Sequence, residues 1–319
     1  MRCILLENTN PYFCLAAEEY LLKNFKEDIF MLWQSSNTIV VGKHQNALGE
    51  INYSFVREND ITVARRISGG GTVFHDEGNV NFSYIKNVNS PAEISFKLFT
   101  GPIVEALSKL GLEASTSGRN DLLISGEKIS GNAEHVFKNR VLHHGTLLFN
   151  SDLKNLGQAI KVVPGKYQGK AIQSIRSEVA NISSFLRRPM KTRQFVEFLL
   201  DVQLRNPENK KVELNETDIL HIQYLAYEKF NTWEWNYGYS PKYSFRNEVK
   251  YKGEKLSIKL DVKKGLIENC ELNGTYFTKE ISKLYGENLI GKYHQFESVK
   301  NELEKHFGDV TEELIYAFF

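Results

Sequence analysis

The sequence has few cysteines, no excess of charge of either sign and no long apolar stretch. Its cysteines, Cys3, Cys14 and Cys270, are odd in number and lack a CxxC spacing, which excludes a fully paired disulfide framework and argues against a thiolate metal site. The 40 Lys and Arg residues balance 39 Asp and Glu residues, so the overall charge gives no sign of a nucleic-acid groove. We expect no nucleic-acid partner.

Targeting signals are also missing from the sequence pattern. The apolar run that precedes Glu7 is four residues long, whereas a signal peptide needs roughly 7–15 apolar residues and a membrane span about 20. We therefore expect a cytoplasmic protein without membrane association. With 319 residues, 41% of them hydrophobic and 12% aromatic, the chain can bury a substantial core.

The local patterns predict helices and strands without the regular alternation of a doubly wound sheet. Asn10 and Pro11 are typical of a helix start and predict a helix over residues 12–23. Ser90-Pro91-Ala92-Glu93 is a capping box that predicts a helix ending before Gly111. Further helices are expected at 52–59, 191–204, 217–230, 297–307 and 311–319. Strands are expected at 29–33, 38–42, 62–66, 72–75, 80–85, 121–124, 128–130, 141–149, 248–251, 255–262 and 266–272.

These elements indicate an α+β protein with mixed or antiparallel sheets and flanking helices. The composition changes at the aromatic stretch 231–241, which we interpret as a packed tether because it is not rich in Gly and Ser. Beyond it, Lys263-Lys264-Gly265 predicts a hairpin turn. We predict a large domain over residues 1–241 and a small α+β accessory domain over 242–319.

A glycine turn between two expected strands carries the strongest chemical signal. Its core is Arg65-Arg66-Ile67-Ser68-Gly69-Gly70-Gly71. Glycines let the backbone approach a ligand closely, and consecutive amides can form an anion-binding nest. Arg65 and Arg66 could supply bidentate donors to a phosphate or carboxylate. The motif is neither a P-loop nor a dinucleotide-binding fingerprint, and a hairpin with two solvated arginines is the structural alternative.

A second cluster follows at residues 118–133. Asn120 and Asp121 offer hard oxygen ligands suited to a magnesium ion that also binds phosphate. Lys128 lies on an expected strand beside small residues, where a cation can neutralise charge on a phosphoryl or acyl oxygen. A solvated surface hairpin remains an equal alternative for this stretch.

The pair His143-His144 does not favour a zinc site, because neighbouring strand residues point to opposite faces. We expect one histidine to pack or to bind a substrate group while the other faces elsewhere. Arg176, within Ser174-Ile175-Arg176-Ser177, could meet a carboxylate of a carrier, with a solvated arginine as the default interpretation.

Taken together, the ordered motifs resemble the lipoate–protein ligases that carry a C-terminal accessory domain. The resemblance covers nearly the whole chain. The matching motifs are Arg65-Arg66-x-Ser68-Gly69-Gly70-Gly71-x-Val73-Phe74-His75-Asp76-x-Gly78-Asn79, Gly118-Arg119-Asn120-Asp121, Lys128-Ile129-Ser130-Gly131, His143-His144-Gly145-Thr146-Leu147-Leu148, Ser174-Ile175-Arg176-Ser177, Trp233-x-Trp235-Asn236-x-Gly238 and Val262-Lys263-Lys264-Gly265.

The resemblance implies a two-step reaction with ATP and Mg2+ as cofactors and lipoate as a substrate. Lipoate and ATP give lipoyl-adenylate and pyrophosphate, and a lysine of a carrier domain then receives the lipoyl group with release of AMP. The implied carriers are lipoyl domains of 2-oxoacid dehydrogenase complexes and the glycine-cleavage H protein. The accessory domain then corresponds to residues 242–319 and the catalytic domain to residues 1–241.

The resemblance also assigns roles to residues of this chain. Lys128 is the expected catalytic residue, and it also touches the lipoyl group together with His144 and Gly145. Asn120 and Asp121 are the expected magnesium ligands. The expected ATP or lipoyl-adenylate site comprises Arg65, Arg66, Ser68, Gly69, Gly70, Gly71, Thr72, Val73, Phe74, His75, Lys128, Ser130, Gly131 and Ala133.

Three alternatives stay open. A lipoyl or octanoyl transferase of the same superfamily normally works through a cysteine thioester, and the three cysteines lie outside both motif clusters, so such a transferase would have to work without a cysteine. Biotin–protein ligase is a related enzyme whose GRGRxGR signature is missing here. A module that only binds lipoyl domains, without catalysis, is the alternative from another class.

Overall fold

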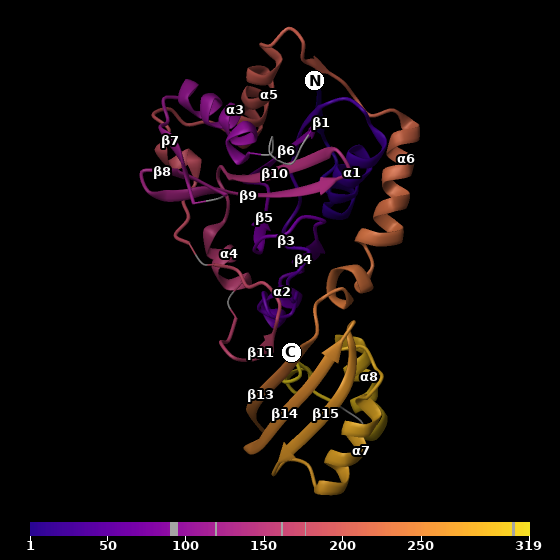
Figure 1. Cartoon of the computed structure of the whole chain (residues 1–319). Helices are drawn as coiled ribbons and strands as arrows, with labels where there is room; N and C mark the ends of the chain where they lie inside the picture. The colour runs from indigo at the N-terminus through magenta and orange to yellow at the C-terminus, as the bar shows by residue number, and fades with distance from the viewer. Residues whose placement is uncertain (90–94, 119, 161, 176, 308–309) are drawn as a thin grey trace. The chain divides into compact units, whose positions relative to one another are not determined.

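The computed structural model describes residues 1–89, 95–118, 120–160, 162–175, 177–307 and 310–319. The capping box at 90–93, Arg119 and Arg176 therefore lie outside the described residues. The chain forms two compact units (Figure 1). Unit 1 comprises Met1–Lys43, Thr62–Leu156 and Ile175–Asn231, and unit 2 comprises His44–Ile61, Gly157–Ser174 and Thr232–Phe319. The functional boundary expected after residue 241 stays a prediction.

Unit 1 is built on an eight-stranded mixed sheet. In spatial order its strands are β12 (Lys210–Lys211), β1 (Arg2–Leu6), β2 (Ile29–Trp33), β6 (Asn79–Asn87), β10 (Arg140–Leu148), β9 (Glu127–Phe137), β8 (Asp121–Ile124) and β7 (Ala114–Ser117). β1 pairs in parallel with its neighbours, whereas β2, β6, β10, β9, β8 and β7 pair antiparallel in succession. The mixed and antiparallel sheets expected from the sequence are confirmed.

Helices pack on this sheet, and the first of them begins where local chemistry predicts. In α1 (Pro11–Asn24), the Asn10 side chain accepts hydrogen bonds from the amides of Tyr12 and Phe13, so the cap read from the sequence is confirmed. α3 (Phe96–Lys109) and α5 (Thr192–Leu204) contribute Phe99 and Phe195 to the main apolar core. α6 (Glu216–Leu225) packs on α1.

A second, three-stranded sheet in unit 1 positions the glycine turn. Its order is β4 (Thr62–Arg65), β3 (Thr38–Val41) and β5 (Val73–His75), with β4 parallel and β5 antiparallel to β3. The chain leaves β4 through the glycine turn and enters β5. A Cβ at Gly42 would lie 2.2 Å from the carbonyl oxygen of Gly70, so the end of β3 can approach the turn only through a glycine.

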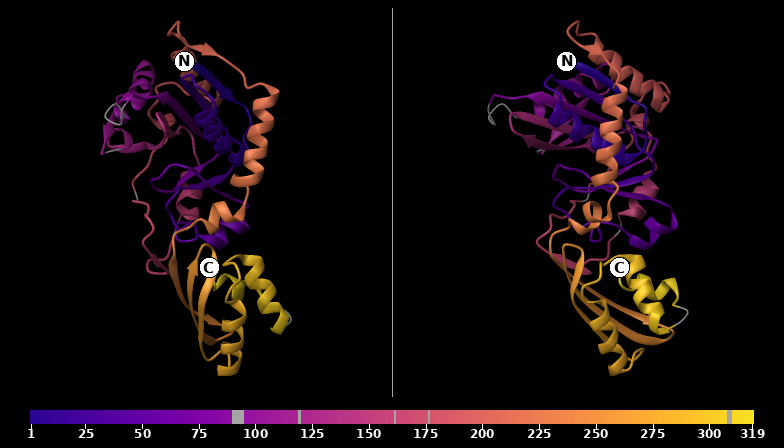
Figure 2. Two further views of the ribbon diagram at one scale, coloured as in Figure 1. Left: turned by 45° about the vertical axis from the view of Figure 1, so that its right-hand side comes forward. Right: turned by 90° about the vertical axis from the view of Figure 1, so that its right-hand side faces the viewer.

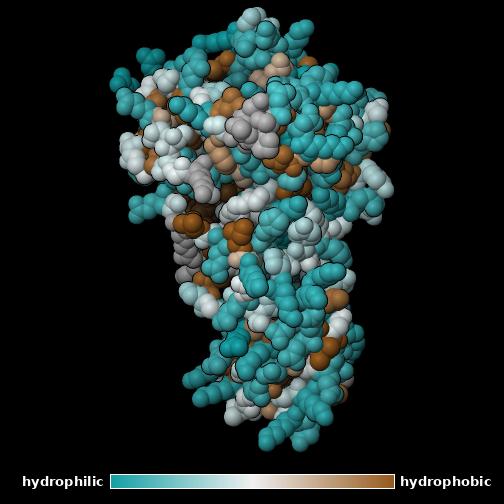
Figure 3. All heavy atoms as spheres, in the orientation of Figure 1, coloured by the Kyte–Doolittle hydropathy of each residue, from teal (hydrophilic) through white to brown (hydrophobic). Residues whose placement is uncertain are grey.

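Unit 2 contains a four-stranded antiparallel sheet, ordered β11 (Tyr167–Gly169), β13 (Tyr243–Tyr251), β14 (Glu254–Lys263) and β15 (Leu266–Gly274). Lys264 and Gly265 have φ values of 51° and 75°, which form the expected hairpin turn. α7 (Lys279–Leu289) and α8 (Phe296–Phe307) cover one face of this sheet (Figure 2). The open face is largely hydrophilic (Figure 3).

The remaining α-helices of the described residues are α2 (Tyr53–Glu58), α4 (Leu153–Ala159) and α9 (Glu312–Tyr316). Shorter helical segments of 3-10 or π type cover Ile182–Phe185, Ala226–Phe230 and Glu234–Gly238. The sequence patterns missed α4 and α7. The expected tether does pack, since the Trp233 ring contacts Tyr293 at 4.8 Å between centroids. Among the described residues, no helix combines the length and apolar character needed to cross a membrane.

Candidate active site

The glycine turn is organised by the guanidinium of Arg66. Arg66 Nη2 donates hydrogen bonds to the carbonyl oxygens of Gly69 at 2.6 Å and Gly71 at 2.7 Å, while Nη1 donates to Val40 at 3.1 Å. Burial lowers the pKa of Arg66 to about 10, and the nearby Glu18 carboxylate opposes that shift. The side chain stays cationic at neutral pH and holds the turn in one shape. The alternative of a solvated arginine is wrong for Arg66.

Arg65 is likewise not solvated. Its side chain is fully buried, and Nη1 donates hydrogen bonds to the carbonyl oxygens of Gly42 at 2.9 Å and Lys43 at 3.3 Å. This arginine joins the ends of β3 and β4 beneath the turn. A direct contact between Arg65 and a bound ligand stays a prediction.

A chain of buried hydrogen bonds runs from the turn to helix α1. Arg66 Nε donates to Ser68 Oγ at 3.0 Å, and Ser68 Oγ lies 2.6 Å from His144 Nε2. His144 Nδ1 lies 2.9 Å from both carboxylate oxygens of the fully buried Glu18. Since the carboxylate only accepts, Nδ1 carries the proton, and Nε2 is then free to accept from the Ser68 hydroxyl.

Glu18 has a further donor. Ser83 Oγ donates to Glu18 Oε1 at 2.6 Å, and Trp33 Nε1 donates to Ser83 Oγ at 3.0 Å. The buried carboxylate is thus hydrogen-bonded by groups from β6 and β10, which offsets the cost of its desolvation. The arrangement fixes the ring of His144, and through Ser68 it fixes the start of the glycine turn.

His75 follows the turn at the end of β5 and is kept neutral. Its Nδ1 lies 3.2 Å from Ser35 Oγ, and its buried Nε2 has no hydrogen-bond partner in the part of the chain that the structure describes. Burial lowers the pKa of His75 to about 3, and the nearby Arg66 charge acts in the same direction. A neutral imidazole with a free ring nitrogen can hydrogen-bond a ligand group.

His143 and His144 have separate sets of partners, as expected for neighbouring strand residues. His143 Nδ1 lies 2.9 Å from Glu134 Oε1, and its ring stacks on Phe99 at 4.7 Å between centroids. His143 therefore packs in the core on the α3 side, while His144 joins the glycine turn. At the next position, a Cβ on Gly145 would lie 2.2 Å from Asn132 Oδ1, so this site excludes any side chain.

Lys128 lies near the start of β9 and forms an ion pair across the β8–β9 hairpin. Its Nζ is 2.9 Å from Asp121 Oδ1, and both side chains are about a quarter exposed, at 23% and 24%. A Cβ on Gly131 would lie 3.5 Å from Lys128 Nζ, so the glycine leaves space beside the ammonium group. The backbone of Lys128 bonds to Glu178 and Ala180, which holds the strand in place. The backbone of Lys128 is therefore held by hydrogen bonds, while its side chain is partly exposed to solvent.

The predicted magnesium ligands are compatible with a metal that also binds substrate phosphates. Asn120 Nδ2 donates a hydrogen bond to the carbonyl oxygen of Asn132 at 3.2 Å. This bond orients the Asn120 side-chain amide and leaves its Oδ1 available to coordinate a cation. Asp121 contributes a partly exposed carboxylate. One carboxylate and one amide oxygen fit Mg2+, which keeps several waters and takes its other ligands from phosphates. Within the described residues there is no group of three or more His, Cys, Asp or Glu side chains arranged as a metal site.

The two sequence clusters come together in unit 1. A Cβ on Gly70, whose φ is 90°, would lie 3.8 Å from Ala133 Cβ, so the turn lies directly beside β9. Of the remaining predicted site residues, Thr72 and Val73 are partly exposed at the turn, whereas Phe74 is buried and Ser130 Oγ accepts a hydrogen bond from Asn132. Their contacts with a ligand stay predictions.

The three thiols are unsuited to nucleophilic catalysis. Cys3, Cys14 and Cys270 are all free and buried. Burial raises the pKa of Cys3 to about 11, that of Cys270 to about 12 and that of Cys14 well above its usual value. A thiolate is the reactive form, so none of them is activated at neutral pH.

Sequence reasoning missed Glu18, which completes the hydrogen-bond chain behind the turn. On a helical pattern a glutamate between apolar residues indicates a solvated position, yet α1 buries both Glu18 and Glu19. The local signal that could have indicated burial of Glu18 is that apolar residues cover a wide face of α1. Gly42 and Asn132 were also missed, because their roles depend on segments distant in the sequence.

Known proteins are similar to this chain over most of its length. The family description "Lipoyl protein ligase A/B catalytic domain" matches residues 10–203, and "Bacterial lipoate protein ligase C-terminus" matches residues 240–318. The chain is 41% identical over 311 residues to "Lipoate--protein ligase 1" of Staphylococcus aureus, covering 95% of this chain and 94% of that protein.

Two solved structures are similar in fold and sequence. One is a bi-partite lipoate protein ligase of Thermoplasma acidophilum, described with its E2 lipoyl domain, with a TM-score of 0.65 and 26% identity over 75% of this chain and 96% of the other. The second is lipoate-protein ligase A bound with ATP, with a TM-score of 0.65 and 25% identity over 75% of this chain and 98% of the other.

Proposed function

The chain belongs to the lipoate–protein ligase family, and from that premise we propose that it activates lipoate with ATP and transfers the lipoyl group to a lysine of a carrier domain. The protein is an enzyme of the ligase type. The observation that carries the detailed proposal is the rigid glycine turn lying beside the Lys128 strand.

In the first step, a carboxylate oxygen of lipoate attacks the α-phosphorus of ATP, the bond to the bridging oxygen breaks, and pyrophosphate leaves. The amides of the turn face the anionic groups, and the Lys128 ammonium neutralises charge on the phosphoryl oxygens and the lipoyl carbonyl. When bound, Mg2+ supplies charge neutralisation at the phosphates, and Asn120 and Asp121 would hold it. Lys128 then has to leave Asp121, which its partly exposed position allows.

In the second step, the ε-amine of the carrier lysine attacks the acyl carbon, the bond to AMP breaks, and the amine proton passes to solvent. The mixed anhydride is already activated, so no nucleophilic side chain is required. The site must instead exclude water. His144 and Gly145 are the proposed neighbours of the lipoyl group, with residues 1–241 as the catalytic domain and 242–319 as the accessory domain.

Lipoyl domains of 2-oxoacid dehydrogenase complexes and the glycine-cleavage H protein are the proposed carriers. The reducing cytoplasm is the proposed compartment, because the three buried thiols are unpaired. The raised pKa values of the cysteines argue against a transferase that works through a thioester.

Mass spectrometry of a lipoyl domain tests the proposal and separates its rivals. We expect one lipoyl group to be added to one lysine when lipoate, ATP and Mg2+ are all present, and no addition when ATP is omitted. Efficient addition from an octanoyl acyl-carrier protein without ATP would identify a transferase instead. Tight binding of the lipoyl domain without modification would identify a binding module.

A further inference from the structure

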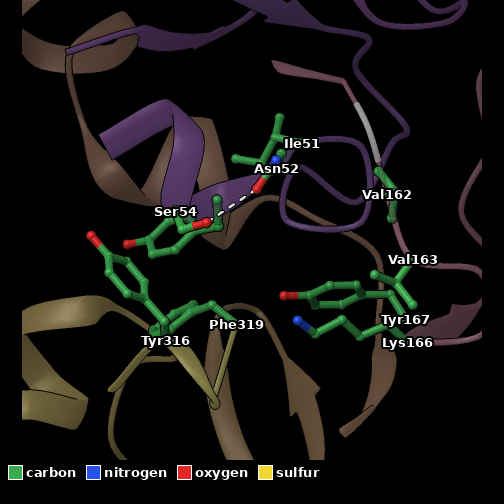
Figure 4. Close-up of a pocket in the computed structure, with 10 residues that line it drawn as sticks. Ile51, Asn52, Ser54, Val162, Val163, Lys166, Tyr167, Tyr316 and Phe319 are labelled. Carbon is green, nitrogen blue, oxygen red and sulfur yellow. Dashed lines mark hydrogen bonds between the residues drawn. The ribbon is translucent and has the colours of Figure 1, made fainter. Parts of the chain in front are cut away.

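A cavity in unit 2, outside the predicted adenylate site, has hydrogen-bond donors without acceptors. Its volume is about 110 Å3, and its walls come from segments 51–54 and 162–167 and from the C-terminal residues Tyr316 and Phe319 (Figure 4). All of these segments belong to unit 2. The Tyr53 ring stacks on Phe319 at 4.4 Å between centroids, which gives the cavity a firm aromatic wall.

The first donor is the phenol of Tyr167. Its Oη is buried and has no hydrogen-bond partner in the described part of the chain. The ring is fixed against Phe245 at 5.1 Å and Tyr243 at 5.7 Å between centroids. A buried hydroxyl without a partner is costly, and it is normally matched by a water or a ligand.

The second donor is the ammonium of Lys166. Figure 4 shows its side chain beside Tyr167, with both polar ends directed into the same space. No ion pair of Lys166 is found within the described ranges, and its Nζ lies over the Phe245 ring, at 5.6 Å from the centroid. The charge of Lys166 also acts on His294, whose pKa is lowered chiefly by burial. Burial lowers the pKa of Lys166, as expected for a cation without a compensating anion.

The other side chains of the cavity wall do not supply that anion. Its ten lining residues include one lysine and no Asp or Glu. Ser54 Oγ donates to Asn52 Oδ1 at 3.2 Å, so the amide oxygen of Asn52 is already in use. Ile51, Val162 and Val163 supply apolar walls. A molecule held here must accept hydrogen bonds, carry negative charge and be small.

We propose that this cavity is a binding site for a small oxyanion, phosphate or a short carboxylate, held by Lys166 Nζ and Tyr167 Oη. The cavity volume of about 110 Å3 leaves room for such an anion. The proposal is independent of the ligase activity.

NMR of the full-length protein labelled at the lysine ε-carbons tests the site directly. The Lys166 signal, assigned by its disappearance in Lys166→Arg, should report a higher ammonium pKa when inorganic phosphate is added at constant ionic strength. Acetate in a second titration distinguishes a carboxylate site from a phosphate site. If both anions leave this signal at its value in chloride, the cavity binds only water and the proposal is wrong.

Matched variants guard against binding at other cationic positions. Tyr167→Phe should weaken anion binding about tenfold, because one hydrogen bond to a charged group is lost. Lys170→Met, at an exposed lysine of the same segment, should leave the binding unchanged. Lys128→Ala should also leave anion binding at Lys166 unchanged. A failure of the anion-site proposal can therefore be told apart from a failure of the ligase proposal. Equal binding by wild type and Tyr167→Phe would contradict the assigned donor.

Discussion

The glycine turn and the lysine strand lie side by side but are stabilised in different ways. The turn is fixed by buried hydrogen bonds that run from Arg66 through Ser68 and His144 to Glu18. Lys128 is instead held at its tip by one partly exposed ion pair with Asp121. This difference indicates that the backbone of the glycine turn is rigid before a ligand binds. The Lys128 ammonium, in contrast, can exchange Asp121 for a substrate group during the reaction.

The comparison predicts that removing the Lys128 charge affects activity far more than stability. We expect Lys128→Ala to slow formation of lipoyl-adenylate by about 100-fold or more, since an electrostatic contact in the transition state is lost. Single-turnover rapid quench with labelled ATP measures the rate, and thermal unfolding checks the fold. Lys97→Ala, at an exposed lysine of α3, is the control and should retain the wild-type rate. A normal rate in Lys128→Ala would remove its assigned role.

Substitutions in the buried hydrogen-bond chain that ends at Glu18 should, unlike Lys128→Ala, cause a large loss of stability. Glu18→Gln places an amide against the donors of Ser83 and His144, and we expect it to lower the free energy of unfolding by about 2 kcal/mol. Urea unfolding measures this value. Glu7→Gln breaks an exposed ion pair with Arg193 instead and should cost about 0.5 kcal/mol. Similar losses in both variants would mean that the buried chain contributes little.

The turn itself offers a matched pair of substitutions. Gly70 has a φ of 90°, and a Cβ there would lie 3.0 Å from Arg66 Nη2. We expect Gly70→Ala to destabilise the protein by about 1–2 kcal/mol through backbone strain. A Cβ on Gly69 would meet no atom within 4 Å, so Gly69→Ala should leave stability nearly unchanged. Equal unfolding midpoints for the two variants would show that the turn is not rigid.

Acid should weaken the buried side of the site. The folded-state pKa of His75, lowered to about 3, lies below the usual value of 6.5. The unfolded chain therefore binds the proton first, and the stability present above pH 6.5 is lost as the pH falls toward 3. In the range between these two pKa values, the slope is about 1.4 kcal/mol per pH unit. Urea unfolding between pH 7 and 4 should give a shallower slope for His75→Gln than for His44→Gln, which alters an exposed histidine. Identical slopes would show that His75 is not buried as a neutral group.

Sequence reasoning predicted the features that depend on local chemistry. The Asn10 cap, the turn at Lys264 and Gly265 and the opposite faces of His143 and His144 all follow from neighbouring residues and strand alternation. Glu18 could not be predicted, because its burial depends on partners in β6 and β10. The packing of segments 44–61 and 157–174 with the C-terminal residues in unit 2 also depends on contacts distant in the sequence.

The most direct test of the central claim is exchange of labelled pyrophosphate into ATP. A rigid turn beside a partly exposed cation is suited to forming an adenylate reversibly, so the wild-type protein should catalyse this exchange only when lipoate is present. Exchange that is absent with lipoate, or equally fast without it, would contradict the account.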